Sequence, residues 1–352
     1  MNKNLKNQNK MEHIAVFRMS AMGDVAISVP ILTAFYEQYP EVKITYLTRP
    51  LFAPMFAHLP NVEVFCPEIN GKHSGLLGLY KLYKELCAKG IEGVVDIHNV
   101  LRTNILKWYF RGSGIPFKQI NKGRREKYAL TRYKFKVFEP LKPSYQRYAD
   151  VFAALGFPID LSDTCLLPPT LVSEPVDKLL NGDDIHIGIA PFASYISKQY
   201  PFDKMCDVIE KLSERYSNGK IYIFGGGKEE EQKVAQIKLP NVENMVGRLS
   251  FNQELELISH LDLMLAMDSG NAHLSAMYGV PTITLWGVTH PYAGFYPYGQ
   301  PMENALLADR TKYPLIPTSV YGKKYPKGYE KAIETISVEM ILEKVEQILN
   351  VL

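Results

Sequence analysis

Several features that identify common protein classes are missing from this sequence. It has only 4 cysteines in 352 residues, and their spacing matches neither a CxxC pair nor a zinc site, so we expect free thiols in a reducing compartment. No window approaches the roughly 18 consecutive apolar residues of a membrane-spanning helix. The first ten residues lack the apolar core of a secretory signal. Together these absences predict a cytoplasmic protein.

Motifs of several enzyme classes are absent as well. There is no Asp-x-Asp pair to hold a metal-bound nucleotide, no HExxH and no Gly-x-Ser-x-Gly. The run Gly225-Gly226-Gly227 is neither GxGxxG nor a P-loop, because Glu229 stands where a P-loop needs Ser or Thr. Metal-dependent sugar transfer, serine hydrolysis, kinase chemistry and a standard NAD site are therefore disfavoured. We expect no metal and no cofactor.

What is present is a globular composition, with 46% apolar and 22% charged residues. The length predicts two domains of about 150 residues each. In both halves short β-rich runs alternate with amphipathic stretches, which is typical of parallel sheets covered by helices. We expect a disordered polar tail at 1–12, α/β domains at 13–165 and 166–335, and an amphipathic helix at 336–352. The predicted strands are 13–17, 43–47, 62–65, 93–97, 185–190, 220–224, 241–246, 262–266 and 282–286.

Charge is distributed unevenly along the chain. Residues 1–150 hold 23 lysines and arginines against 12 acidic residues, whereas the remainder holds 17 against 25. Such a basic excess is most often a solvated surface, but it also suits an anionic partner. Nucleic acid, an anionic membrane surface and a phosphorylated substrate are the candidates. No RNP-like motif, KH loop or zinc finger is present, so nucleic acid is the least favoured.

Candidate site residues follow the predicted strands, where open α/β sheets bind ligands. Asp24, after the first strand, is either a helix cap or a carboxylate available as a general base. Lys198, in the loop that begins at Ala190, is either an exposed lysine or a phosphate contact. The triple glycine allows close approach of a nucleotide, although a plain strand-to-helix turn has the same sequence.

The strongest pattern is Asp268-Ser269-Gly270-x-x-His273. It follows a predicted strand and opens a helix whose free N–H groups and positive dipole end favour a diphosphate. A lone helical histidine is usually structural. The neighbouring anion site favours a functional role for His273.

These motifs, in this order, resemble glycosyltransferase family 9, the ADP-heptose lipopolysaccharide heptosyltransferases. The resemblance runs from Met22-Gly23-Asp24 through Lys198 and the triple glycine to Asp268–His273 and Gly279-Val280-Pro281-Thr282. It implies the GT-B fold, in which two Rossmann-like domains face an interdomain cleft. The nucleotide-sugar donor then lies mainly on the second domain and the acceptor on the first, and the final helix packs back toward the first domain.

The resemblance also implies residue roles. Asp24 is similar to the general base and Lys198 to a diphosphate contact, with no metal. The remaining donor contacts would be Ser194, Gly226, Gly227, Glu229, Leu249, Asp268, Ser269, Gly270 and His273. The acceptor contacts would be Arg49, His98, Asn99, Arg102, Arg124 and Arg125.

The implied reaction is inverting transfer of heptose from ADP-heptose to the inner core of lipopolysaccharide or lipooligosaccharide. Its partners would be the donor, an anionic glycolipid acceptor and the anionic inner face of the cytoplasmic membrane, where the enzyme would be peripheral. Two alternatives stay open. One is a GT-B enzyme with another donor, such as a UDP-sugar transferase or an epimerase. The other is a non-catalytic protein that binds polysaccharide or a membrane surface.

Overall fold

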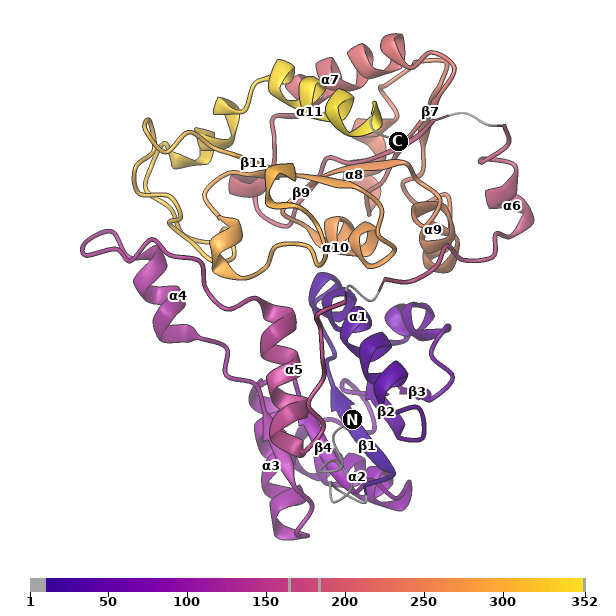
Figure 1. Cartoon of the computed structure of the whole chain (residues 1–352), viewed down its shortest axis with the longest axis vertical. Coiled ribbons are helices and arrows are strands. Elements are labelled where there is room, and N and C mark those ends of the chain that lie inside the picture. Colours follow the sequence, from indigo (N-terminus) through magenta and orange to yellow (C-terminus); the bar gives the residue numbers. More distant parts are fainter. Residues whose placement is uncertain (1–10, 164–165, 183–184, 351–352) are drawn as a thin grey trace. The chain divides into compact units, whose positions relative to one another are not determined.

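The computed structural model describes residues 11–163, 166–182 and 185–350, so most of the predicted polar tail lies outside it. The chain divides into two compact units (Figure 1). Unit 1 comprises Met1–Lys122 and Ser144–Cys165, and unit 2 comprises Gly123–Pro143 and Leu166–Leu352. Each unit holds one parallel sheet with helices around it. The predicted α/β class with two parallel sheets is thus confirmed.

In the described part of unit 1, five parallel strands form a sheet in the order β3-β2-β1-β4-β5. Apolar residues such as Val16 and Val94 are fully buried, as expected for strands covered on both faces. The strands are β1 (His13–Phe17), β2 (Lys43–Leu47), β3 (Val62–Phe65), β4 (Gly93–Asp96) and β5 (Phe117–Gln119). The helices are α1 (Met22–Gln38), α2 (Gly75–Ala88), α3 (Leu101–Gly112) and α5 (Ser144–Leu155), with a 3-10 turn η1 (Pro50–Phe56).

In the described part of unit 2, six parallel strands form a sheet in the order β11-β10-β9-β6-β7-β8. The strands are β6 (His186–Ala190), β7 (Lys220–Ile223), β8 (Val242–Asn244), β9 (Leu263–Met267), β10 (Thr282–Trp286) and β11 (Ala305–Leu307). The helices are α4 (Arg124–Thr131), α6 (Glu174–Asp177), α7 (Phe202–Arg215), α8 (Lys228–Val234), α9 (Phe251–Ile258), α10 (Gly270–Met277) and α11 (Val338–Leu349). The 3-10 turns are η2 (Ile196–Lys198), η3 (Pro291–Ala293), η4 (Met302–Asn304) and η5 (Tyr329–Thr335).

Local sequence explains the helices of unit 2. In α7 the buried residues Met205, Val208, Ile209 and Leu212 recur at helical spacing and form one apolar face. Helix α9 begins with a capping box, because Ser250 accepts a hydrogen bond from the backbone N–H of Gln253 while the Gln253 side chain accepts one from Ser250.

The units depart from the sequence-based boundaries in two places. The segment Gly123–Pro143, which includes α4, belongs to unit 2 although it lies inside the sequence of the predicted first domain. Helix α11 packs within unit 2, where Ile341 and Val345 join the core beneath α7. The sequence could not reveal either arrangement, because an amphipathic helix shows which face is apolar but not which partner covers it. None of the described helices is long and apolar enough to cross a membrane.

Both sheets have the strand order of a Rossmann half, in which the chain reverses direction across the sheet beside the first strand. In unit 1 the switch point lies between β1 and β4, and in unit 2 between β6 and β9. Ligands of open α/β sheets bind outside the carboxyl ends of the strands at such points. The loops that follow these four strands therefore position any site in each unit.

Candidate active site

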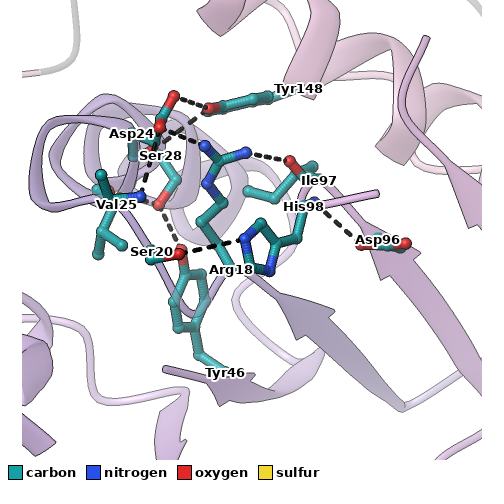
Figure 2. Close-up of polar contacts among 11 residues, drawn as sticks. Arg18, Ser20, Asp24, Val25, Ser28, Tyr46, Asp96, Ile97, His98 and Tyr148 are labelled. Carbon is teal, nitrogen blue, oxygen red and sulfur yellow. Dashed lines mark hydrogen bonds and ion pairs between the residues drawn. The ribbon is translucent and has the colours of Figure 1, made fainter. Parts of the chain in front are cut away.

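In unit 1, Asp24 lies in the first turn of α1, directly after the loop that follows β1. Its carboxylate forms an ion pair with the Arg18 guanidinium. The Tyr148 hydroxyl, from α5, donates a hydrogen bond to Asp24 Oδ1 at 3.4 Å (Figure 2). The backbone N–H of Ala21 donates to Oδ2 at 3.4 Å, so Asp24 also caps its own helix. The carboxylate is thus held from three sides while 24% of the side chain stays exposed.

The charge states of this cluster follow from burial and pairing. Burial lowers the pKa of Arg18, whereas Tyr148 and Asp24 raise it. The second effect is the larger, so the pKa lies above its usual value and the guanidinium stays charged. Arg18 also donates a hydrogen bond to the Ile97 carbonyl at 2.7 Å. Burial raises the pKa of Tyr148 well above its usual value, although Arg18 opposes the shift. Tyr148 therefore stays a neutral donor to the Asp24 carboxylate.

His98 and Asn99 follow β4 across the switch point. The side chain of Asp96 accepts hydrogen bonds from the backbone N–H groups of both, at 2.9 and 3.0 Å, which fixes the turn. His98 Nε2 lies 3.3 Å from Ser20 Oγ in the loop after β1. Burial, reinforced by the positive charges of Arg18 and Lys122, lowers the pKa of His98 to about 3. The imidazole is therefore neutral at physiological pH.

The other predicted acceptor residues are distributed over both units. Arg49 is exposed and precedes η1, and Arg102 is exposed in the first turn of α3. Arg124 and Arg125 are exposed on α4, which belongs to unit 2. The structure therefore brings Asp24 and His98 into one cluster, but it does not place Arg124 and Arg125 in the same unit as them.

In unit 2, Lys198 and Asp268 meet at the switch point between β6 and β9. Lys198 Nζ lies 2.9 Å from Asp268 Oδ2, and the two side chains are only 15% and 10% exposed. The Thr289 hydroxyl donates a second hydrogen bond to that oxygen at 2.8 Å. The carboxylate thus orients the lysine, and Thr289 fixes the carboxylate.

A tail segment near Gly322 packs against the lysine. The Ser197 hydroxyl donates a hydrogen bond to the Gly322 carbonyl at 2.6 Å. Gly322 has a φ of +84°, and a Cβ placed there would lie 2.8 Å from Cγ and Cδ of Lys198. Only glycine fits this close approach without displacing the lysine.

The rest of the Asp268–His273 pattern lies where the sequence predicts, at the start of α10. Ser269 is the N-cap residue and Gly270 begins the helix, whereas His273 is buried in it. The Ser269 side chain makes no capping bond, and its buried Oγ has no hydrogen-bond partner among the described residues. This hydroxyl and the first-turn N–H groups are consequently available to an anion.

The remaining predicted donor residues lie in unit 2 as well. Ser194 is exposed after β6, and Glu229 is exposed in the first turn of α8. The backbone N–H of Gly226 donates to Glu230 at 2.7 Å, and Gly227 has a φ of +89° that explains its glycine. Leu249 lines a hollow of about 510 Å³ with Arg248 and Lys178, which does not include Lys198 or Asp268.

Sequence reasoning missed Tyr148, Thr289 and Gly322 as members of these clusters. Tyr148 lies 124 positions after Asp24 in the sequence, and no local pattern links two such residues. Arg18 directly follows β1 and precedes the motif Met22-Gly23-Asp24, and this place after a strand was the one indication of its role. Among the described residues, no group of three or more His, Cys, Asp or Glu side chains is arranged to hold a metal ion.

Comparison with known proteins agrees with this architecture. The profile of glycosyltransferase family 9 (heptosyltransferase) matches residues 79–323. A lipooligosaccharide heptosyltransferase 2 of Haemophilus influenzae is 24% identical, with 96% of this chain and 99% of the relative covered.

Two solved structures share the fold. The glycosyl transferase family 9 protein of Veillonella parvula has a TM-score of 0.74 at 19% identity, covering 98% of this chain and 99% of that one. The E. coli heptosyltransferase WaaC with ADP-2-deoxy-2-fluoro heptose has a TM-score of 0.66 at 18% identity, covering 95% and 99%. The predicted GT-B fold class is thereby confirmed.

The family profile covers well over half of the chain, and the Haemophilus influenzae relative aligns over 96% of it. The chain therefore belongs to glycosyltransferase family 9, the heptosyltransferases, and is a glycosyltransferase.

Proposed function

We propose that this glycosyltransferase moves a heptose from ADP-heptose to the inner core of lipopolysaccharide or lipooligosaccharide, with inversion and without a metal. The observation that carries the proposal is the arrangement of Asp24, a partly exposed carboxylate held at a switch point by Arg18 and Tyr148. The names of the relatives support the sugar and the acceptor, since one is a lipooligosaccharide heptosyltransferase and another was solved with an ADP-heptose analogue.

Asp24 acts as the general base in this proposal. Its carboxylate removes the proton of the acceptor hydroxyl as that oxygen attacks the anomeric carbon of the heptose. The new C–O bond forms while the bond from the anomeric carbon to the phosphate oxygen breaks, and ADP leaves with the bonding electrons. A single displacement of this kind inverts the anomeric centre.

Lys198 and the start of α10 stabilise the departing diphosphate. Negative charge grows on the leaving oxygen, and a positioned ammonium group and helix N–H groups offset it without a cation. Asp268 does not contact the phosphate directly, because two anions repel. It holds Lys198 at 2.9 Å, and the Ser269 hydroxyl and Gly270 N–H complete the contact.

The acceptor is an anionic glycolipid in this proposal, and the enzyme is peripheral on the inner face of the cytoplasmic membrane. The exposed Arg49 and Arg102 in unit 1 suit the phosphates and carboxylates of such an acceptor. The neutral His98 and Asn99 suit its hydroxyl groups, since an uncharged imidazole can accept or donate a hydrogen bond.

The test begins with the donor. The protein is heated with ADP, UDP, GDP or CMP, and a ligand present at 100 times its Kd adds about 2.7 kcal/mol to the free energy of unfolding. We expect ADP to stabilise the protein most, and ADP-heptose to yield a heptosylated acceptor in the presence of EDTA. Stabilisation by UDP alone would favour the UDP-sugar enzymes instead. Loss of transfer in EDTA with recovery in magnesium or manganese would refute the metal-independent mechanism.

A further inference from the structure

The segment Gly123–Pro143, called here the inserted segment, packs against the rest of unit 2. Lys127 Nζ lies 4.1 Å from the centre of the Phe295 ring, and Leu130 is fully buried. Lys136 donates a hydrogen bond to the Pro317 carbonyl at 2.6 Å. These contacts make the inserted segment a folded part of unit 2.

The C-terminal end of the inserted segment is also held against the rest of unit 2. The Arg310 guanidinium lies 3.4 Å above the centre of the Phe138 ring, and the backbone N–H of Leu141 donates to the Tyr292 carbonyl at 2.9 Å. The chain between these contacts is consequently held at both ends.

The inserted segment also exposes large apolar side chains. Phe135 is 87% exposed, Tyr128 68%, Tyr133 51% and Val137 43%. A single exposed apolar residue is ordinary, but a group of four within ten residues marks a binding surface.

The turn that presents Phe135 is ordered. The residue has a φ of +55°, which is rare for a side chain with a bulky ring. Arg132 Nε donates a hydrogen bond to the Phe135 carbonyl at 2.6 Å, and the Val137 N–H donates to the Ala129 carbonyl at 3.0 Å. These hydrogen bonds thus fix a turn that holds the Phe135 ring exposed to solvent.

Basic residues are interspersed with these aromatic residues in the sequence. The inserted segment has seven lysines and arginines against Glu126 and Glu139. Arg124, Arg125 and Lys134 are exposed. Aromatic rings beside basic side chains are the composition of surfaces that bind anionic lipid, because the rings enter the headgroup region and the cations pair with phosphates.

We propose that the inserted segment is the membrane-docking surface of unit 2, with Tyr133 and Phe135 entering an anionic bilayer and Arg124, Arg125 and Lys134 contacting its headgroups. The docking proposal rests on the proposed function in one respect, because the proposed glycolipid acceptor lies in such a bilayer. Charge complementarity selects the bilayer over a protein partner.

Flotation of the full chain with two kinds of lipid vesicle tests this surface. One kind contains phosphatidylcholine alone, and in the other about 30% of the lipid is the anionic phosphatidylglycerol. We expect the wild type to float only with anionic vesicles. Phe135→Ser should weaken binding by about tenfold or more, given the apolar area of a phenyl ring. Arg124→Glu with Arg125→Glu should weaken it by more than about 25-fold at low salt, and added salt should abolish wild-type binding.

Two matched variants serve as controls. Leu171 is 95% exposed in unit 2 and stands three positions before the acidic Glu174 in the sequence, so Leu171→Ser should float like the wild type. Trp108 is a 71% exposed aromatic residue of unit 1, near Arg111. Should Trp108→Ser abolish flotation while Phe135→Ser leaves it intact, the docking surface would be in unit 1 and the proposal overturned. Failure of the wild type to bind either vesicle would overturn it as well.

Transfer assays separate this proposal from the proposed function. With an acceptor stripped of its acyl chains, Phe135→Ser should react at the wild-type rate, since Phe135 has no part in the chemistry. With the intact acceptor in vesicles its rate should fall by about tenfold, in line with its binding. If the wild type transfers heptose to neither acceptor, the proposed function fails while the flotation result still decides the docking surface. Equal wild-type and Phe135→Ser rates on vesicles would refute docking by Phe135.

Discussion

The two switch points use the same topology and the same kind of ion pair in opposite ways. In unit 1 the cation is the inner partner, because the Arg18 side chain is 8% exposed while Asp24 is 24% exposed. In unit 2 the carboxylate is the inner partner, because Asp268 is 10% exposed and held by Thr289, while Lys198 is 15% exposed. One site presents a carboxylate that can take a proton, and the other presents a cation that can hold a phosphate.

The largest effect should come from removing the charge that unit 1 presents. Asp24→Asn keeps an oxygen that can accept the Ala21 N–H bond but removes the base, so transfer should fall by about 100- to 10,000-fold. ADP affinity, measured by calorimetry, should be nearly unchanged. Asp203→Asn, at an exposed first-turn aspartate of α7, is the control and should retain activity. Near-normal turnover of Asp24→Asn would leave Asp24 with a capping role alone.

The next largest effect should come from removing the charge that unit 2 presents. Lys198→Met removes a charged contact to the diphosphate, which is worth about 1.5–3 kcal/mol, so ADP affinity should fall by about 10- to 100-fold. Lys238→Met, at an exposed lysine of the same unit before β8, should bind ADP like the wild type. Equal affinities in the two variants would show that Lys198 serves only its ion pair with Asp268.

Acidification should destabilise both units, because each contains a buried neutral histidine. Burial lowers the pKa of His98 to about 3 and that of His290 to about 4, with nearby positive charges adding to each shift. The unfolded chain takes up protons near pH 6.5 while the folded chain does not, so stability is present above that pH and is lost as pH falls toward the folded pKa.

Between pH 7 and pH 5 each histidine should therefore cost about 2 kcal/mol of unfolding free energy. Urea unfolding of His98→Gln and His290→Gln at both pH values measures the effect. Each variant should be less sensitive to acid than the wild type by about that amount. A variant with the wild-type slope would show that its histidine is protonated in the folded protein.

The smallest effect should come from crowding the lysine of unit 2. Gly322→Ala and Gly328→Ala both place a side chain at positive φ, at +84° and +91°, and each should lose about 1–2 kcal/mol of stability. Nothing lies within 4 Å of a Cβ at Gly328, whereas one at Gly322 meets Lys198. Only Gly322→Ala should weaken ADP binding, by about a few-fold. A similar loss in Gly328→Ala would indicate a general effect of the tail.

The sequence predicted long strands well and short or composite features poorly. Strands β1, β2, β3 and β10 have the predicted limits, because their apolar runs are bounded by loops or helix starts on both sides. The strands β5 and β11 were missed, since three residues give no measurable alternation. Helix α4 was missed because its sequence is mostly charged and polar.

The candidate site was predicted only as far as local patterns extend. Asp24, Lys198 and Asp268 follow strands and stand in motifs, so their places could be predicted. Their partners Tyr148 and Thr289 come from other elements and are recruited by packing, which a single sequence does not encode in any local pattern. The same limit explains why Arg124 and Arg125 were assigned to the first domain. Their place in unit 2 depends on contacts that the inserted segment makes with residues distant in the sequence.

The inserted segment also constrains how the protein can be synthesised. Its packing partners Phe295, Arg310 and Pro317 are translated more than about a hundred residues later, at about 5–20 residues per second. The Phe138 ring therefore lacks its partners Tyr292 and Arg310 for many seconds after it is synthesised. Between the strands of unit 1 and helix α5, the nascent chain holds a segment without these packing partners until the ribosome has nearly finished. A chaperone that binds short apolar stretches should therefore find a target there during translation.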